Sequence, residues 1–117
     1  MKKVLLFAMC IGPLQVLADE ASAKAAMHVH GACIVKSYEI YKQSKAEPGD
    51  IADAVIGKCD QAREVMYDEY RSFMLSKTSG SVKAQSQADV LINRRRTSDI
   101  DQDRRTIIGW VLEDRSQ

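Results

Sequence analysis

The fold is decided by the stretch CIVKSYEIYKQSKAEPGDIADAVIGKC, residues 33–59, in which two cysteines enclose one strong turn signal. Pro48-Gly49 supplies that signal, because proline fixes its own φ angle and glycine accepts conformations that end regular structure. The turn lies nearly midway between Cys33 and Cys59. Two antiparallel helices folded about it would bring the two cysteines level with each other. We therefore predict a disulfide between Cys33 and Cys59.

Both segments that flank the turn have the periodicity of amphipathic helices, over about 20–45 and 51–75. In the first, apolar residues occupy one half of the helix: Ala26, Met27, Val29, Cys33, Ile34, Tyr38, Ile40 and Tyr41. In the second, they share one face: Ile51, Ala54, Val55, Cys59, Ala62, Val65, Met66, Tyr70 and Phe73. Each cysteine lies on the apolar half of its helix, and Asp50 is expected to cap the second helix at its N-terminus.

The C-terminal part of the chain predicts further helices after a polar connector at 76–81. One helix is expected over about 82–96, capped by Ser81 or Ser79. Thr97-Ser98-Asp99 then interrupts the pattern, and a further helix is expected over about 99–115. Whether 82–115 forms two helices or one kinked helix stays open at this point. The sequence thus predicts an all-α fold, a small antiparallel bundle of three to four helices with one disulfide linking the first two.

The N-terminal residues 1–18 have the pattern of a Sec-type signal peptide. Lys2 and Lys3 precede an uncharged apolar run from Val4 to Leu17, which is too short for a membrane-spanning helix. The small residue Ala18 ends the run, so we expect cleavage there and a single helical domain over 19–117. Such a protein would be periplasmic or secreted, in a bacterial cell, without stable insertion in the membrane.

Charge and size narrow the classes of function. Loss of Lys2 and Lys3 would take the formal net charge from +1 to −1. A nearly neutral domain has no field that would attract nucleic acid or anionic lipid, so we expect neither as a partner. An oxidising compartment and an even number of remaining cysteines also agree with the predicted disulfide.

No pattern in the sequence predicts an enzyme or a cofactor. The chain contains no nucleophile elbow, phosphate-binding glycine loop or zinc-protease motif. His28 and His30 point to nearly opposite sides of a helix and cannot hold one ion together. Met27 and His30 share a face at i,i+3 spacing and are the candidate pair for copper, but the sequence identifies no third ligand. The interpretation that we favour is a packed His30, with no metal site.

The C-terminal helix carries the candidate contacts for a partner. Its apolar residues span a broad arc on which Trp110 lies at the edge, with Arg104 and Arg105 nearby. Tryptophan and arginine dominate binding hot spots, so these three residues are our hypothesis for an interface with a second copy of this chain or with a foreign protein. The alternative is that Trp110 closes the core.

These observations lead to a small non-enzymatic binding protein, such as an immunity or inhibitor protein that occludes an enzyme of the cell envelope. A second hypothesis is an envelope protein of acid stress with a chaperone-like role. A third is a small copper-binding protein that uses Met27 and His30.

Overall fold

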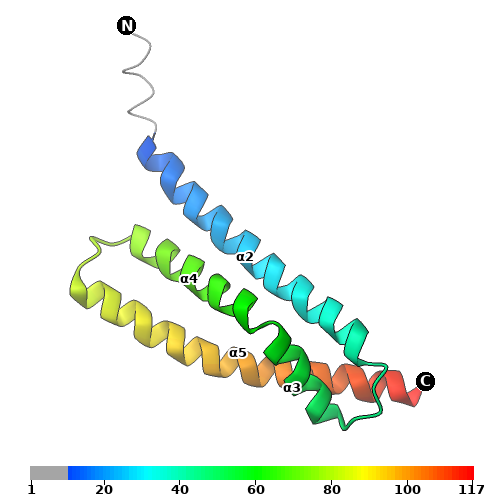
Figure 1. Cartoon of the computed structure of the whole chain (residues 1–117). Coiled ribbons are helices and arrows are strands. Elements are labelled where there is room, and N and C mark those ends of the chain that lie inside the picture. The colour runs from blue at the N-terminus through cyan, green and yellow to red at the C-terminus, as the bar shows by residue number, and fades with distance from the viewer. Residues whose placement is uncertain (1–10) are drawn as a thin grey trace, which may run out of the picture.

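The structure is a computed structural model that describes the backbone of residues 11–117 and the side chains of residues 19–117. Within this range the chain forms four helices and no strand, which confirms the predicted all-α bundle. The helices are α2 (Ile11–Tyr41), α3 (Pro48–Lys58), α4 (Asp60–Ser76) and α5 (Val82–Ser116). Figure 1 shows α4 lying between α2 and α5, and α3 lying against the C-terminal half of α5.

The predicted signal peptide lies mostly outside the described residues. From Ile11 the backbone is already helical, and the predicted cleavage point after Ala18 falls within α2. Among the helices of the described part of the chain, none combines the length and apolar character needed to cross a bilayer.

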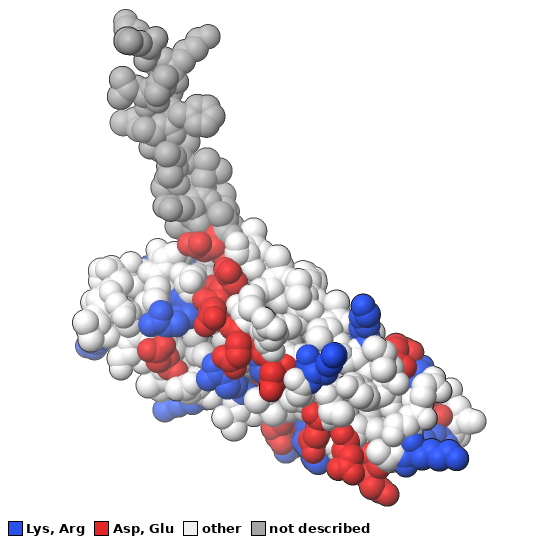
Figure 2. Space-filling view, in the orientation of Figure 1, with Lys and Arg blue, Asp and Glu red and all other residues white. Residues whose placement is uncertain are grey.

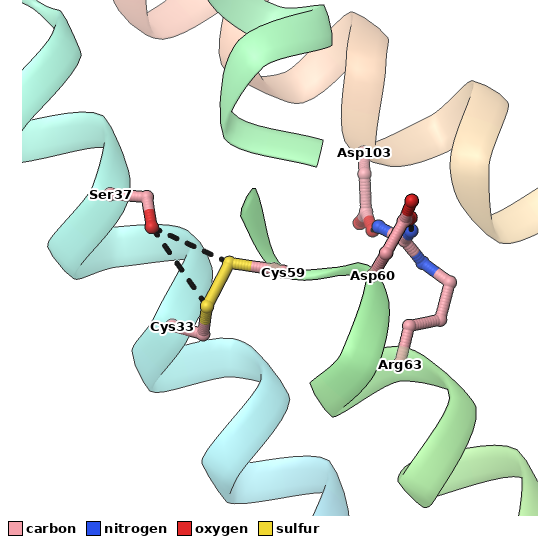
Figure 3. Close-up of a disulfide and its surroundings, with 6 residues drawn as sticks. All are labelled: Cys33, Ser37, Cys59, Asp60, Arg63 and Asp103. Atoms are coloured by element: carbon pink, nitrogen blue, oxygen red, sulfur yellow. Dashed lines mark hydrogen bonds and ion pairs between the residues drawn. A yellow bond between two sulfur atoms is a disulfide. The ribbon is translucent and has the colours of Figure 1, made fainter. Parts of the chain in front are cut away.

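The Cys33–Cys59 disulfide is confirmed, and it joins α2 to the point where α3 gives way to α4. The two Cα atoms lie 5.9 Å apart, and Cys59 is buried. The hydroxyl of Ser37, one turn beyond Cys33, lies 3.5 Å from the sulfur of Cys59 and 3.8 Å from that of Cys33 (Figure 3). The bond therefore connects the middle of one long helix to a break in the neighbouring one.

That break corrects the prediction of one helix over 51–75. At Cys59 the backbone departs from helical geometry (φ −104°, ψ 12°), and its N–H contacts the carbonyls of both Val55 and Ile56. Gly57, two residues earlier, has the weakest helix propensity of any residue other than proline. The break changes the direction of the chain, so that α3 packs mainly on α5 whereas α4 packs mainly on α2.

The start of α3 also differs from the prediction. Pro48 occupies the first turn, where its missing N–H costs no hydrogen bond, so the helix begins there and Glu47 is the capping position. Asp50 consequently lies inside the first turn rather than at the cap. The preceding helix α2 ends at Tyr41, short of residue 45, because the Ser44 hydroxyl accepts a hydrogen bond from the Ala46 N–H and forms a local turn.

The open question about 82–115 is answered by one continuous helix, α5. Ser81 caps it as predicted, since its side chain accepts a hydrogen bond from the Ala84 N–H. The interruption predicted at 97–99 is absent. The Thr97 hydroxyl donates back to the Asn93 carbonyl, and the Asp99 carboxylate accepts from Tyr67 of α4, so neither side chain competes for the backbone.

The apolar core lies at the α3 end of the molecule. It consists of buried residues from α2, α3, the break and α5: Ile34, Tyr38, Ile51, Ala52, Val55, Ile56, Cys59, Ile107 and Val111. From α4, in contrast, only Arg63 and Tyr67 are buried. The large apolar cluster thus lies at one end, whereas the buried apolar residues of the described chain outside it are few: Ala23, Ala26, Tyr67, Ala88 and Ile92.

We predict that the disulfide accounts for a large part of the stability of this fold. Closing a loop of 26 residues restricts the unfolded chain by about 3 to 4 kcal/mol. The free energy of unfolding in urea should therefore fall by about 2 to 5 kcal/mol in the Cys33→Ser, Cys59→Ser double variant. The mature protein, without residues 1–18 and therefore without Cys10, should have no titratable thiol before reduction. Free thiols in the mature protein, or an unchanged unfolding midpoint, would contradict this assignment.

Candidate functional site

A cavity of about 280 Å³ lies between α2, α4 and α5. Nine residues of the three helices line it: Met27 and His30 from α2; Met66, Tyr67 and Tyr70 from α4; and Arg95, Asp99, Gln102 and Asp103 from α5.

A second cavity, between α4 and α5, continues the first toward the other end of α5. It is lined by Met74, Leu91, Arg94 and Ser98 and shares Tyr70, Arg95 and Asp99 with the first cavity. The Arg95 guanidinium lies 5.3 Å from the centre of the Tyr70 ring, at the junction of the two. We call the two cavities together the groove.

A buried arginine lies beside the groove. Arg63 of α4 is 1% exposed, and its Nη1 donates to the Asp60 carboxylate over 2.7 Å. Its Nη2 lies 3.8 Å from the Asp103 carboxylate, too far for a hydrogen bond. The Arg63 Nε and Nη2 have no hydrogen-bond partner in the described part of the chain. Figure 3 shows the Arg63 guanidinium close to the carboxylates of Asp60 and Asp103.

His30 is the second buried polar residue at this place. It is 8% exposed, and its Nε2 atom has no hydrogen-bond partner among the described residues. Burial lowers the pKa of His30 and the positive charge of Arg63 lowers it further, whereas Asp103 and Asp99 of α5 act in the opposite direction. The His30 ring is therefore neutral at pH 7. Burial also raises the pKa of the nearby Asp103 carboxyl, against the influence of His30 and Arg63.

The seam between α4 and α5 is held largely by polar contacts. The Tyr67 hydroxyl donates to the Asp99 carboxylate over 2.7 Å, and both burial and this bond raise the pKa of Tyr67. Further along the seam, Arg96 makes two hydrogen bonds to Glu64, and Arg71 makes one to Asp89. On the face shown in Figure 2, acidic side chains form a run that begins next to the grey segment, and basic side chains lie beside it.

The three residues predicted to bind a partner lie on different sides of α5. Arg104 pairs with Asp53 of α3 over 2.9 Å, and Arg105 pairs with Asp101 of its own helix over 3.0 Å. Trp110 is half-buried, with its ring centre 5.2 Å from that of Tyr38 on α2. Trp110 follows Asp99 and Asp103 at helical spacing on α5, but its contact is with α2 and not with the α4 side chains that line the groove. The interface hypothesis for these three residues stays a prediction.

The candidate metal pair, Met27 and His30, does line one cavity, together with Met66 of α4. Sequence reasoning identified neither Met66 nor the buried Arg63 as part of a site. The spacing of the sequence could have predicted that Arg63 is buried, because Cys59, Arg63 and Tyr67 follow one another at i,i+4 spacing on one helical face. All three are buried in the structure. The described His, Cys, Asp and Glu side chains form no group of three that could hold a metal ion.

Comparison of the chain with protein-family models, with curated proteins and with solved structures finds no match.

We predict that acid destabilises the fold through His30. Because its pKa is lowered in the folded state, the unfolded chain takes up the proton first as the pH falls through about 6.5. The free energy of unfolding should fall below that pH by at most about 1.4 kcal/mol per pH unit for this one group. Urea unfolding measured between about pH 7.5 and 5.5 tests this.

Asp103 has the opposite effect on the pH dependence of stability, because its raised pKa lets the folded state take up a proton before the unfolded chain does. Variants of the two histidines therefore isolate the contribution of His30. His30→Gln should flatten the pH dependence, whereas His28→Gln, which changes an exposed histidine of the same helix, should leave it unchanged. An unaltered pH dependence in His30→Gln would refute the assignment.

Proposed function

We propose that this chain is a small exported, non-enzymatic binding protein and that its groove receives a segment of another protein. The composition of the groove is the observation that carries this proposal. Methionine, tyrosine and arginine are enriched at protein interfaces, and methionine adapts its shape to a partner. In the groove, Met27 and Leu91 are about half exposed, and Met66, Met74 and Tyr70 are partly buried.

The groove also has the form in which helical proteins bind a helix or an extended segment. Such grooves take the apolar face of a partner segment, and charged residues at the rim fix its orientation. Here the apolar side chains come from α4 and α5, while Arg94 and Arg95 of α5 supply positive charge beside them. A partner segment with apolar anchors and a neighbouring acidic residue would match both the apolar side chains and the positive charge of the groove.

Within this class we favour an immunity or inhibitor protein that occludes an enzyme of the cell envelope. The covalent bond between α2 and the α3–α4 break supports this choice, because a pre-organised surface loses little entropy when it binds. The disulfide is itself typical of an oxidising compartment, such as the periplasm or the extracellular space. A second copy of this chain is the alternative occupant of the groove.

One observation favours the second hypothesis, an acid-stress protein with a chaperone-like role. Protonation of His30 would place a second positive charge beside Arg63 in a buried position between α2 and α4. This would loosen the two helices that border the groove and expose more apolar surface in acid. Binding that appears only in acid distinguishes this role from that of an inhibitor.

We predict that Leu91→Glu abolishes partner binding. Leu91 is 54% exposed in the groove, so a carboxylate there would introduce charge into an apolar contact with little effect on folding. Leu112→Glu is the matched control, because Leu112 is 55% exposed on the same helix and lines none of the described cavities. The partner is captured from the cell envelope, identified, purified and titrated against each variant at pH 7.5 and 5.

The inhibitor proposal predicts a one-to-one complex with an envelope enzyme, loss of that enzyme's activity on binding, and weaker binding by Leu91→Glu alone. Equal binding by both variants would place the interface elsewhere. Failure of the purified protein to inhibit its purified partner would reject the inhibitor role.

A further inference from the structure

Three residues with neutral donor groups, two thioethers and one imidazole, line the cavity between α2, α4 and α5. Met27 and His30 lie one turn apart on α2, and Met66 enters from α4, which packs closely on α2 beside the disulfide. Neither methionine is locked in the core: Met27 is 49% exposed and Met66 is partly buried. A methionine with three rotatable bonds can turn its sulfur toward a neighbouring group at little cost.

His30 gives an independent indication of a ligand. The residue is more than nine-tenths buried, it lines the cavity, and its Nε2 has neither solvent nor a hydrogen-bond partner in the described residues. Buried polar atoms are normally paired, so the unpaired Nε2 of a residue that lines the cavity calls for a partner that the described residues do not supply, and a bound ligand would supply one once the ring turns toward the cavity. The ring is also neutral at pH 7, which is the form that binds metals.

We propose that this cavity binds one Cu(I) ion through the thioether sulfurs of Met27 and Met66 and the imidazole of His30. Thioethers are soft ligands that select Cu(I), whereas Mg²⁺, Ca²⁺ and Mn²⁺ prefer oxygen ligands. Imidazole is also a common ligand of copper. The site requires no thiolate, and both described cysteines are joined in the disulfide.

The charged groups around the cavity balance. The negative Asp99 and Asp103 and the positive Arg95 line its α5 wall, and Arg63 lies buried alongside. The choice of ion therefore follows from the neutral soft donors of α2 and α4, while Asp99 already accepts a hydrogen bond from Tyr67. This inference does not depend on the proposed protein partner, because binding of the ion is measured with the purified protein alone, and Leu91 lines the second cavity and not the first.

The test uses the purified, oxidised protein under anaerobic conditions, with Cu(I) supplied in competition with the chromophoric chelator bicinchoninate. Absence of titratable thiol is verified first, because a reduced cysteine would bind Cu(I) itself. One equivalent should bind. Met27→Leu and Met66→Leu should each weaken binding at least about tenfold, since even the outer partners of metal ligands contribute about 10- to 100-fold. Leucine nearly conserves the volume of methionine, so the fold is retained.

Met74→Leu is the matched control, because Met74 lies on α4 in the second cavity and outside the first. It should bind Cu(I) as the unchanged protein does. NMR of protein labelled with ¹³C in the methionine methyl groups gives a readout that does not depend on folding of variants. On addition of redox-inert Ag(I), the Met27 and Met66 signals should shift and the Met74 signal should not. Absence of a one-to-one complex, or equal weakening by Met74→Leu, would overturn the proposal.

Discussion

The Cys33–Cys59 bond is the constraint on which the rest of the structure depends, because it ties the middle of α2 to a break in the neighbouring helix. One covalent bond therefore sets the position of two helices. Before the break, α3 turns its apolar face toward α2 and α5 and builds the core around Val55 and Ile107, both fully buried. After the break, α4 runs back along α2 (Figure 1). The groove lies beyond this point, where α2 and α5 border α4.

The apolar core that stabilises the fold and the groove that we propose as the binding site lie at different ends of the molecule. At the α3 end, branched side chains and the Tyr38–Trp110 contact exclude water. At the other end, the described contacts between α4 and α5 are largely ion pairs and hydrogen bonds, which contribute little when exposed to solvent. The buried Arg63 and His30 carry unpaired polar atoms, which cost free energy that the core and the disulfide offset. Unpaired buried polar atoms are typical of ligand-binding sites, and these two residues lie beside or in the groove.

Features that depend on residues close together in the sequence could be predicted from the sequence. The spacing of cysteines about Pro48-Gly49 predicted the disulfide, and Ser81 was a correct cap. Features that depend on packing were missed. The break at Cys59 changes the phase of the second helix, so Val65, placed on the apolar face, is 48% exposed. The pair Met27 and His30 followed from helical spacing, but Met66 enters only because α4 packs on α2, which the periodicity of each helix alone does not specify.

Amide hydrogen exchange, compared between the oxidised and the reduced protein, tests most directly whether the disulfide holds α2 against α4 and so maintains the groove. The account predicts that reduction accelerates exchange most in α2 around Cys33 and in α4 around Met66. The amides of α3 and of α5 near Ile107, which belong to the apolar core, should remain the slowest. An equal acceleration in all four helices, or none in α2 and α4, would contradict the account, because the groove would then not depend on this bond.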